Sequence, residues 1–448
     1  MLFFVNRLFI DILLIKMFSH LKYKFIQQSD MTNNIFKLDL EKLNYYAFLL
    51  LAFSLNFPQT VIKFTFGFWL ITCIFSIDSH RKATIKEVYY IPLLLLSLLI
   101  IGRIIVSLIH NDFPSLMSKL LDTQLALLVL PVLIILHANR YFNLKQVLFF
   151  YLIGCITSCI IAVSYFYLYR YNILSGTVEG IPLGTYTHKL ADDISLFQLF
   201  ISPFFKHRAA MGANISLAVG SLAYLVKSAN QLSFFRIVAT FITILILSAV
   251  LYSTGSRSGI ISLTFVLFAS AVYIFKRKRI IFIVFALIGL SIAGLSTLKA
   301  TRIIDKGVTD YQKDMSKVDP RIQIWKCAIE IIRDHPLLGV GYSKVKPELY
   351  EKYKENGLTS EVNAKHNSHN QFLQFALESG IGVSLIFMFI LLPIYFEKRV
   401  YFLSLSFSST FFIYSMFEDS LIIINGLTIF VFFIALLTLS QKQFTISR

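Results

Sequence analysis

The sequence predicts an all-α, polytopic membrane protein of about twelve transmembrane helices, with a large extracytoplasmic loop between the ninth and tenth spans. Three observations predict this class. Of the 448 residues, 56% are hydrophobic and 15% are charged, whereas a soluble domain carries roughly 25% charged residues. The apolar residues form runs of about 17 to 25 residues, the length that crosses a hydrocarbon layer as a helix. Basic residues gather in alternate loops between these runs.

The apolar runs, taken in chain order, define the predicted spans. Most of them lack a polar face, which is typical of helices packed in a lipid-embedded bundle. The spans are expected at 45–57, 60–76, 90–109, 118–137, 146–168, 210–227, 235–252, 258–275, 280–298, 372–396, 400–417 and 421–440.

The basic residues of the loops predict which side each loop occupies. They follow the second, fourth, eighth and tenth spans and flank the connection between the sixth and seventh. These residues are Arg81, Lys82, Lys86, Arg140, Lys145, Lys227, Arg236, Lys276, Arg277, Lys278, Arg279, Lys398 and Arg399. The positive-inside rule places these loops and both termini in the cytoplasm. The net charge of +17 has this cause, so we expect no nucleic-acid partner.

Two longer loops lie on the opposite side, at 169–209 and 299–371. Loops of such length usually carry function. The predicted organisation is a cytoplasmic or interfacial segment over 1–44, transmembrane helices over 45–298, an extracytoplasmic catalytic loop over 299–371, and further transmembrane helices with a cytoplasmic tail over 372–448.

The first 30 residues are apolar but are interrupted by Arg7, Asp11 and Lys16. They show no small-residue cleavage site, so we do not expect a signal peptide. Two interpretations stay open. The segment is an interfacial helix, or it precedes a natural start at Met31.

The segment that follows Asp319 is expected to form an amphipathic helix on the membrane surface. Its apolar residues recur at helical spacing: Ile322, Trp325, Ile329 and Ile332. Arg321 and Trp325 share one face of this helix. We interpret Trp325 as an anchor at the membrane interface, and Arg321 as either a snorkelling anchor or an anion ligand.

His366 and His369 stand just before the apolar run that opens the tenth span. Asn367 or Ser368 is suited to cap that helix, which would place His369 in its first turn. The positive end of a helix disfavours imidazolium, so His369 is expected to be neutral and able to accept a proton. The two histidines have no apparent third ligand, so we expect no metal and no cofactor.

Arginines are expected to gather on the same side of the membrane. Arg257 lies in a tight turn between two spans, Arg208 lies at the outer mouth of the sixth span, and Arg103 falls within an apolar run. Ionisable side chains in a membrane are costly and are usually paired or functional. Several guanidinium groups suit an anion such as a diphosphate.

Three motifs carry a family resemblance: SRSG at 256–259, RIQIW with HPLLGVG within 321–341, and His369-Asn370 separated by nine residues from Gly380. They resemble the O-antigen ligase and polymerase superfamily, which are membrane glycosyltransferases of the bacterial envelope. The resemblance implies a GT-C-like fold, an inner-membrane location, a periplasmic active site, and transfer of a glycan from undecaprenyl diphosphate. A ligase transfers it to lipid A-core, and a polymerase to another lipid-linked glycan.

With this chemistry, His369 is the expected catalytic base, because an acceptor hydroxyl is a poor nucleophile. Arg321, Arg208 and Arg257 are expected to bind the diphosphate, and direct displacement would invert the anomeric carbon. The supporting residues are His366, Asn370, Trp325 and Gly380.

Other functions stay open. The His-Asn spacing favours a ligase over a repeat-unit polymerase or a protein-directed oligosaccharyltransferase. A transporter of lipid-linked saccharides would use the same arginines without chemistry. Transporters often show internal repeats and broken helices at the membrane midplane. The chain shows no convincing repeat, and its polar residues gather at the outer surface, which favours an enzyme.

Overall fold

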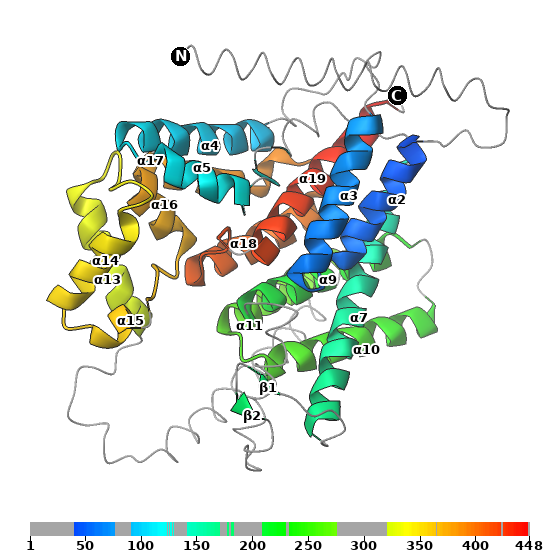
Figure 1. Ribbon diagram of the computed structural model, residues 1–448. Coiled ribbons are helices and arrows are strands. Elements are labelled where there is room, and N and C mark those ends of the chain that lie inside the picture. The colour runs from blue at the N-terminus through cyan, green and yellow to red at the C-terminus, as the bar shows by residue number, and fades with distance from the viewer. Residues whose placement is uncertain are drawn as a thin grey trace.

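In the computed structural model, the secondary structure of the described residues is helical apart from one short strand pair (Figure 1). The strand pair joins β1 (Thr177–Val178) to β2 (Ile181–Pro182). The structure describes residues 40–76, 91–122, 124, 126–127, 129, 141–170, 177–178, 181–182, 208–229, 233–275, 320–363, 365–422 and 424–446. The expected span at 280–298 and the N-terminal segment up to residue 39 lie outside these ranges, as does most of the loop at 169–209 and of the span at 118–137.

Most described helices lie over the apolar runs. Seven of them are long and apolar enough to cross a membrane: α3 (Gln59–Ser76), α4 (Ile91–Ile109), α7 (Leu144–Arg170), α9 (Arg208–Lys227), α10 (Phe234–Ser253), α11 (Arg257–Ile274) and α19 (Ile424–Ile446). The shorter helices α2 (Leu40–Ser54) and α18 (Tyr401–Phe417) cover two further runs. The chain is therefore a polytopic membrane protein.

Helices α9 and α19 form the centre of the bundle. The share of each span buried inside the protein is 83% for α9 and 94% for α19, against 17% for α10. Small residues along α9 permit this close packing: Gly212 lies so near Gly259 of α11 that a Cβ there would be 2.6 Å from the Gly259 Cα. The exposed apolar side of α10 suits contact with lipid.

Basic side chains tie several helix ends together. Lys145 Nζ, at the start of α7, donates to the Ser228 carbonyl at 3.2 Å. Lys227 Nζ, at the end of α9, donates to the Ile274 carbonyl of α11 at 3.3 Å. The start of α7 and the ends of α9 and α11 therefore lie together, as the predicted alternation of these spans requires.

The expected tenth span is two helices. These are α16 (Gln371–Ser379) and α17 (Ile381–Ile390), and the short 3-10 helix η5 (Pro393–Tyr395) follows them. The break is at Gly380, whose φ is +87°, and a Cβ there would lie 1.9 Å from the Leu337 carbonyl oxygen. Apolar residues lie on both sides of this glycine over the length of one span, so hydropathy alone predicted a single helix.

The described part of the expected extracytoplasmic loop, from residue 320 onward, folds as a helical group beside α16 (Figure 1). It contains α13 (Pro320–Asp334), α14 (Val345–Glu355) and α15 (Thr359–Asn363). Its apolar core includes Ile324, Ala328, Ile331, Leu349 and Leu377.

The face of α13 that packs on the protein differs from the expected stripe. Ile322 is 44% exposed and Ile329 is 47% exposed. The contact runs instead through Ile324, Ala328 and Ile331, together with Ile332 from the end of the expected stripe. Because α13 carries apolar residues on two sides, its periodicity did not show which side contacts α14 and α16.

Candidate active site

His369 lies in a short loop between α15 and α16, one residue before the helix cap. The cap is Asn370, whose Oδ1 accepts from the backbone amides of Phe372 at 3.0 Å and Leu373 at 3.1 Å. The expectation that Asn367 or Ser368 caps the helix, with His369 in its first turn, was therefore wrong. His369 has a φ of +46°, a strained backbone conformation of the kind that gathers at functional sites.

The His369 ring faces a carboxylate. Its Nδ1 lies 3.1 Å from Glu418 Oε2, and the other oxygen of Glu418 accepts from Arg321 Nη2 at 2.7 Å. Glu418 follows α18, so this contact joins the loop before α16 to α13 through the end of a third helix. The structure thus brings two of the expected site residues, His369 and Arg321, to one carboxylate.

This geometry assigns the ring nitrogens of a neutral His369. A carboxylate paired with an arginine only accepts, so the Nδ1 atom carries the hydrogen. The lone pair is then on Nε2, on the side of the ring away from Glu418. The His369 side chain is 22% exposed, which lets a substrate reach this nitrogen.

His366 has its own acidic partner. Its Nδ1 lies 2.6 Å from Glu361 Oε2, and its ring stands perpendicular to the His369 ring with centroids 5.1 Å apart. His366 therefore packs against His369 from the solvent side, since its side chain is 41% exposed.

A second carboxylate lies behind the loop. Asp419 Oδ1 lies 3.1 Å from Ser368 Oγ and accepts from the backbone amide of Asn370 at 3.1 Å. Burial raises the pKa of the Asp419 carboxyl to about 7, although the nearby His369 lowers it in part. Asp419 therefore holds the loop from the protein interior, and its proton is retained to an unusually high pH.

The remaining arginines of the expected site start two helices. Arg208 is the first residue of α9 and Arg257 the first of α11, and both are exposed. The two helices are in close contact one turn into each, at Gly212 and Gly259. The structure therefore places these arginines at neighbouring helix ends, while Arg321 reaches the site from α13.

Trp325 and Gly380 have packing positions. The Trp325 ring lies 6.2 Å from that of Phe417, the residue before Glu418, and its Nε1 is buried with no hydrogen-bond partner among the described residues. Trp325 thus supports the end of α18 next to the carboxylate. Gly380 accommodates the close approach of the chain at Leu337.

Glu418 and Asp419 were not among the residues expected from the sequence. They stand in FEDS, a pair of acidic residues between two apolar runs. Acidic residues at a membrane boundary are a sequence signal for function, and this signal was available. Their closeness to His369, 49 residues earlier, arises only from the packing of α16 against α18.

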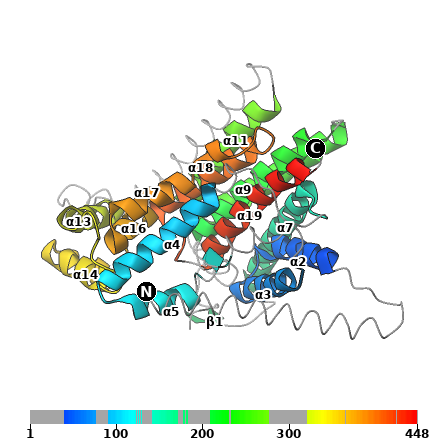
Figure 2. The same cartoon turned by 90° about the horizontal axis from the view of Figure 1, so that it is seen from above.

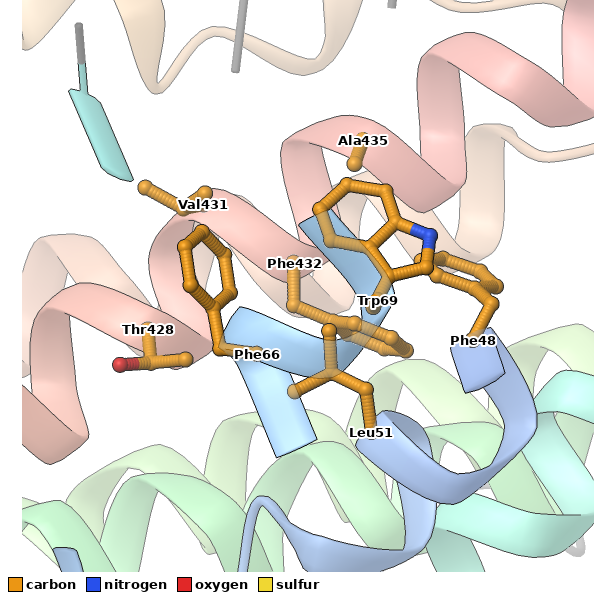
Figure 3. Close-up of a pocket in the computed structure, with 8 residues that line it drawn as sticks. All are labelled: Phe48, Leu51, Phe66, Trp69, Thr428, Val431, Phe432 and Ala435. Atoms are coloured by element: carbon orange, nitrogen blue, oxygen red, sulfur yellow. The ribbon is translucent and has the colours of Figure 1, made fainter. Parts of the chain in front are cut away.

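A separate hollow lies among α2, α3 and α19 and is not a catalytic site (Figure 3). Its walls are apolar and aromatic, with Trp69, Phe66 and Phe432 among them, and Thr428 is the only polar residue that lines it. Within the part of the chain that the structure describes, no cluster of three or more His, Cys, Asp or Glu side chains could hold a metal.

Comparison with known proteins gives a similarity over one part of the chain. Residues 242–388 match the family model described as O-antigen ligase. No curated protein matches the chain. The matched region contains Arg257, Arg321 and His369, whereas Glu418 and Asp419 lie beyond it. The chain is therefore a polytopic membrane protein whose residues 242–388 are similar to the O-antigen ligase family.

Proposed function

We propose that the protein is an O-antigen ligase-like enzyme of the bacterial inner membrane. It transfers a glycan from undecaprenyl diphosphate to lipid A-core on the periplasmic face, with no metal and no nucleotide sugar. Both termini are cytoplasmic in this proposal. The family match supports the class of enzyme, and the His369 geometry supports the mechanism.

The reaction is a direct displacement. The acceptor hydroxyl oxygen attacks the anomeric carbon, and the bond from that carbon to the diphosphate oxygen breaks. The hydroxyl proton moves to His369 Nε2, and undecaprenyl diphosphate leaves with the bonding electron pair. Attack from the side opposite the leaving group inverts the anomeric configuration.

Glu418 prepares His369 for this role. Its carboxylate accepts the hydrogen bond of Nδ1, with 3.1 Å between nitrogen and oxygen, which fixes the tautomer and the ring orientation. It also stabilises the imidazolium that forms when Nε2 takes the proton. Arg321, at 2.7 Å from the same carboxylate, balances its charge. A positioned base of this kind typically contributes about 10²–10⁴-fold in rate.

The donor diphosphate needs cations more than a proton donor, because diphosphate is already a good leaving group. Arg321 is 27% exposed and lies beside the base, which suits it to contact the donor. Arg208 and Arg257, at neighbouring helix ends, are proposed to bind the same diphosphate. Guanidinium groups match phosphate oxygens with paired donors.

The observation that carries this proposal is the shared carboxylate of Glu418, which orients His369 and pairs with Arg321. The test is transfer by the purified protein with a polyprenyl-diphosphate-linked glycan and lipid A-core. We expect His369→Ala to abolish product and Arg321→Ala to weaken use of the donor. If folded His369→Ala protein and the wild type give equal product yields, the catalytic assignment is refuted.

The same assay separates the alternatives. Product that forms only when a second lipid-linked glycan replaces lipid A-core would indicate a polymerase. Movement of the donor across the membrane of vesicles that contain the protein, without any covalent product, would indicate a transporter. The surface glycans of a deletion strain give an independent answer: bare lipid A-core with long glycan on its carrier indicates a ligase, and core with one repeat unit indicates a polymerase.

A further inference from the structure

We propose that Arg103 and Glu378, a buried ion pair below the active-site loop, are positioning residues that keep Asp419 protonated and thereby keep His369 available as a base. The inference rests on the proposed function in its use of His369. The two residues do not touch substrate. Their contacts connect α4 to the loop before α16.

The ion pair is buried in the interior. Arg103 of α4 and Glu378 of α16 have side chains 2% and 3% exposed, and their charged atoms are 2.9 Å apart. Figures 1 and 2 show α4 running alongside α16 and α17. Arg103 also donates to Gln124 Oε1 at 2.8 Å, and Gln124 donates to the Leu421 carbonyl at 3.0 Å. The pair therefore braces the segment that follows Asp419 as well.

A chain of side chains leads from this pair to Asp419. Gln374 Nε2 donates to Glu378 Oε1 at 2.9 Å. Ser368 Oγ lies 3.1 Å from Gln374 Oε1 and 3.1 Å from Asp419 Oδ1. The side chains of this network are all buried: Ser368, Gln374, Glu378 and Asp419. Water is therefore largely excluded, and each hydrogen bond has to be made between these groups.

A protonated Asp419 satisfies more of these contacts than an ionised one. Glu378 is paired with an arginine and acts as an acceptor, so the Gln374 amide must turn its NH₂ to Glu378 and its oxygen to Ser368. Ser368 has a single hydrogen, and three oxygens lie 3.1 Å from its Oγ: the Asn370 carbonyl, Gln374 Oε1 and Asp419 Oδ1. An ionised Asp419 only accepts, so it would compete with the other two oxygens for that one hydrogen. A protonated Asp419 supplies a second hydrogen and donates to Ser368.

Further observations agree with a neutral Asp419. Its second oxygen, Oδ2, is buried and has no hydrogen-bond partner among the described residues, which a neutral acid tolerates better than an anion. The titratable groups that face it are the carboxylates of Glu378 and Glu418, the hydroxyls of Tyr353 and Tyr414, the His369 ring and, beyond Glu418, Arg321. The two carboxylates favour the protonated form, and each already has an arginine partner.

The protonation of Asp419 matters for His369 because His369 is the charged group that acts most strongly on it. A neutral Asp419 leaves Glu418, balanced by Arg321, as the carboxylate that orients the ring. An ionised Asp419 would add a negative charge nearby and stabilise the imidazolium. The base would then be protonated, and so inactive, up to a higher pH.

Two variants test this idea. Glu378→Gln removes the carboxylate that fixes the orientation of Gln374. The Gln374 amide can then turn its NH₂ toward Ser368, which leaves the Ser368 hydrogen for an Asp419 that has released its proton to solvent. Gln374→Met removes one of the two acceptors that compete with an ionised Asp419 for the Ser368 hydrogen, while the ion pair stays. In both, we expect the acidic limb of the pH profile of kcat/KM to move upward by about one pH unit. Asp419→Asn added to either variant should return the limb to its wild-type position.

A second readout does not depend on catalysis. Diethyl pyrocarbonate reacts with neutral imidazole, and peptide mass spectrometry gives the rate at His369 as a function of pH. We expect the same upward shift in both variants. Glu355→Gln, a substitution at a carboxylate 63% exposed on α14, is the matched control and should shift neither readout.

The outcomes separate the two proposals. Lower activity at every pH with an unmoved limb would show that Arg103 and Glu378 are only structural, and a shift that Asp419→Asn fails to reverse would refute the assignment to Asp419. If the wild type forms no product, the proposed function fails, and the modification of His369 still decides the inference. Should Glu378→Gln not fold, Gln374→Met gives the same answer.

Discussion

Glu418 joins parts of the chain that are far apart in sequence. Its two carboxylate oxygens contact Arg321, 97 residues before it, and His369, 49 residues before it. At 6% exposure the carboxylate is nearly removed from water. Its interactions with both partners are therefore stronger than those of a surface ion pair.

Glu418→Gln tests the tautomer of His369. An amide of the same size can turn its NH₂ toward Nδ1, which moves the hydrogen to Nε2 and blocks the base. We expect kcat for glycan transfer to fall by about 10²-fold, with a smaller change in KM. Glu330→Gln, at a carboxylate 47% exposed on α13, should stay within about twofold. An unchanged kcat in Glu418→Gln would contradict the proposed role of this carboxylate.

The raised pKa of Asp419 makes the stability of the protein depend on pH. Its pKa is raised from 3.8 to about 7 in the folded protein, so between these values the folded state binds a proton that the unfolded state has released. The free energy of unfolding therefore falls as pH rises from about 4 to about 7. Asp419→Asn removes this dependence and should stabilise the protein at pH 8 by about 2 to 4 kcal/mol.

Unfolding of detergent-solubilised protein at several pH values measures this effect. The exposed Asp122, at the end of α5 (Phe113–Asp122), gives the matched control, and Asp122→Asn should keep the wild-type pH dependence. If Asp419→Asn is less stable than the wild type at pH 8 and equally stable at pH 5, the raised pKa is wrong.

At the scale of elements, the break between α16 and α17 is a docking point for the loop. The amide of Val340 donates to the Leu377 carbonyl at 2.7 Å, and the amide of Ile381 donates to the Pro336 carbonyl at 2.9 Å. The segment HPLLGVG therefore attaches directly to the broken helix. This attachment fixes the end of α13, and with it Arg321, relative to α16 and His369.

Two glycines beside this break give a matched pair of substitutions. Gly380→Ala would place a Cβ 1.9 Å from the Leu337 carbonyl oxygen, at a φ of +87°, while a Cβ at Gly382 would have no atom within 4 Å. We expect Gly380→Ala to lower the free energy of unfolding by about 3 kcal/mol or more. Gly382→Ala lies within α17 and should be neutral or stabilising by about 0.5 kcal/mol. Similar unfolding midpoints for the two variants would show that the break is not strained.

At the scale of the whole molecule, hydropathy predicted the helices that lipid requires. Helices α3, α9, α10 and α11 begin and end within a few residues of the expected runs, because a helix must satisfy its own backbone in a membrane. The break at Gly380 was missed since the apolar residues on its two sides together have the length of one span. What makes it a break is the approach of a distant chain segment, which local sequence does not encode.

The candidate site was predictable where a motif is local and unpredictable where packing forms it. His369 and Arg321 could be singled out from their own segments. The capping residue could not, because Asn367, Ser368 and Asn370 all have suitable side chains and only the hydrogen bonds of Asn370 decide. Asp419 likewise required the fold, since its contacts with Ser368 and Asn370 cross between elements.

The orientation of the molecule in the membrane can be measured by labelling introduced cysteines. The native cysteines Cys73, Cys155, Cys159 and Cys327 are all buried, so a cysteine placed on the surface is the main site that a membrane-impermeant maleimide can label. Glu355 belongs to the helical group that carries the proposed site, and Lys398 to the basic loop before α18; both are exposed.

In sealed right-side-out vesicles, we expect Glu355→Cys to be labelled at once and Lys398→Cys only after the membrane is permeabilised, because the positive-inside rule retains the basic loop in the cytoplasm. The helical group and His369 then share the outer side, where a lipid-linked glycan meets its acceptor. Labelling of Lys398→Cys from outside, with Glu355→Cys protected, would show that the protein has the opposite orientation in the membrane. It would place the imidazole in the cytoplasm, and the proposed transfer reaction would be impossible there.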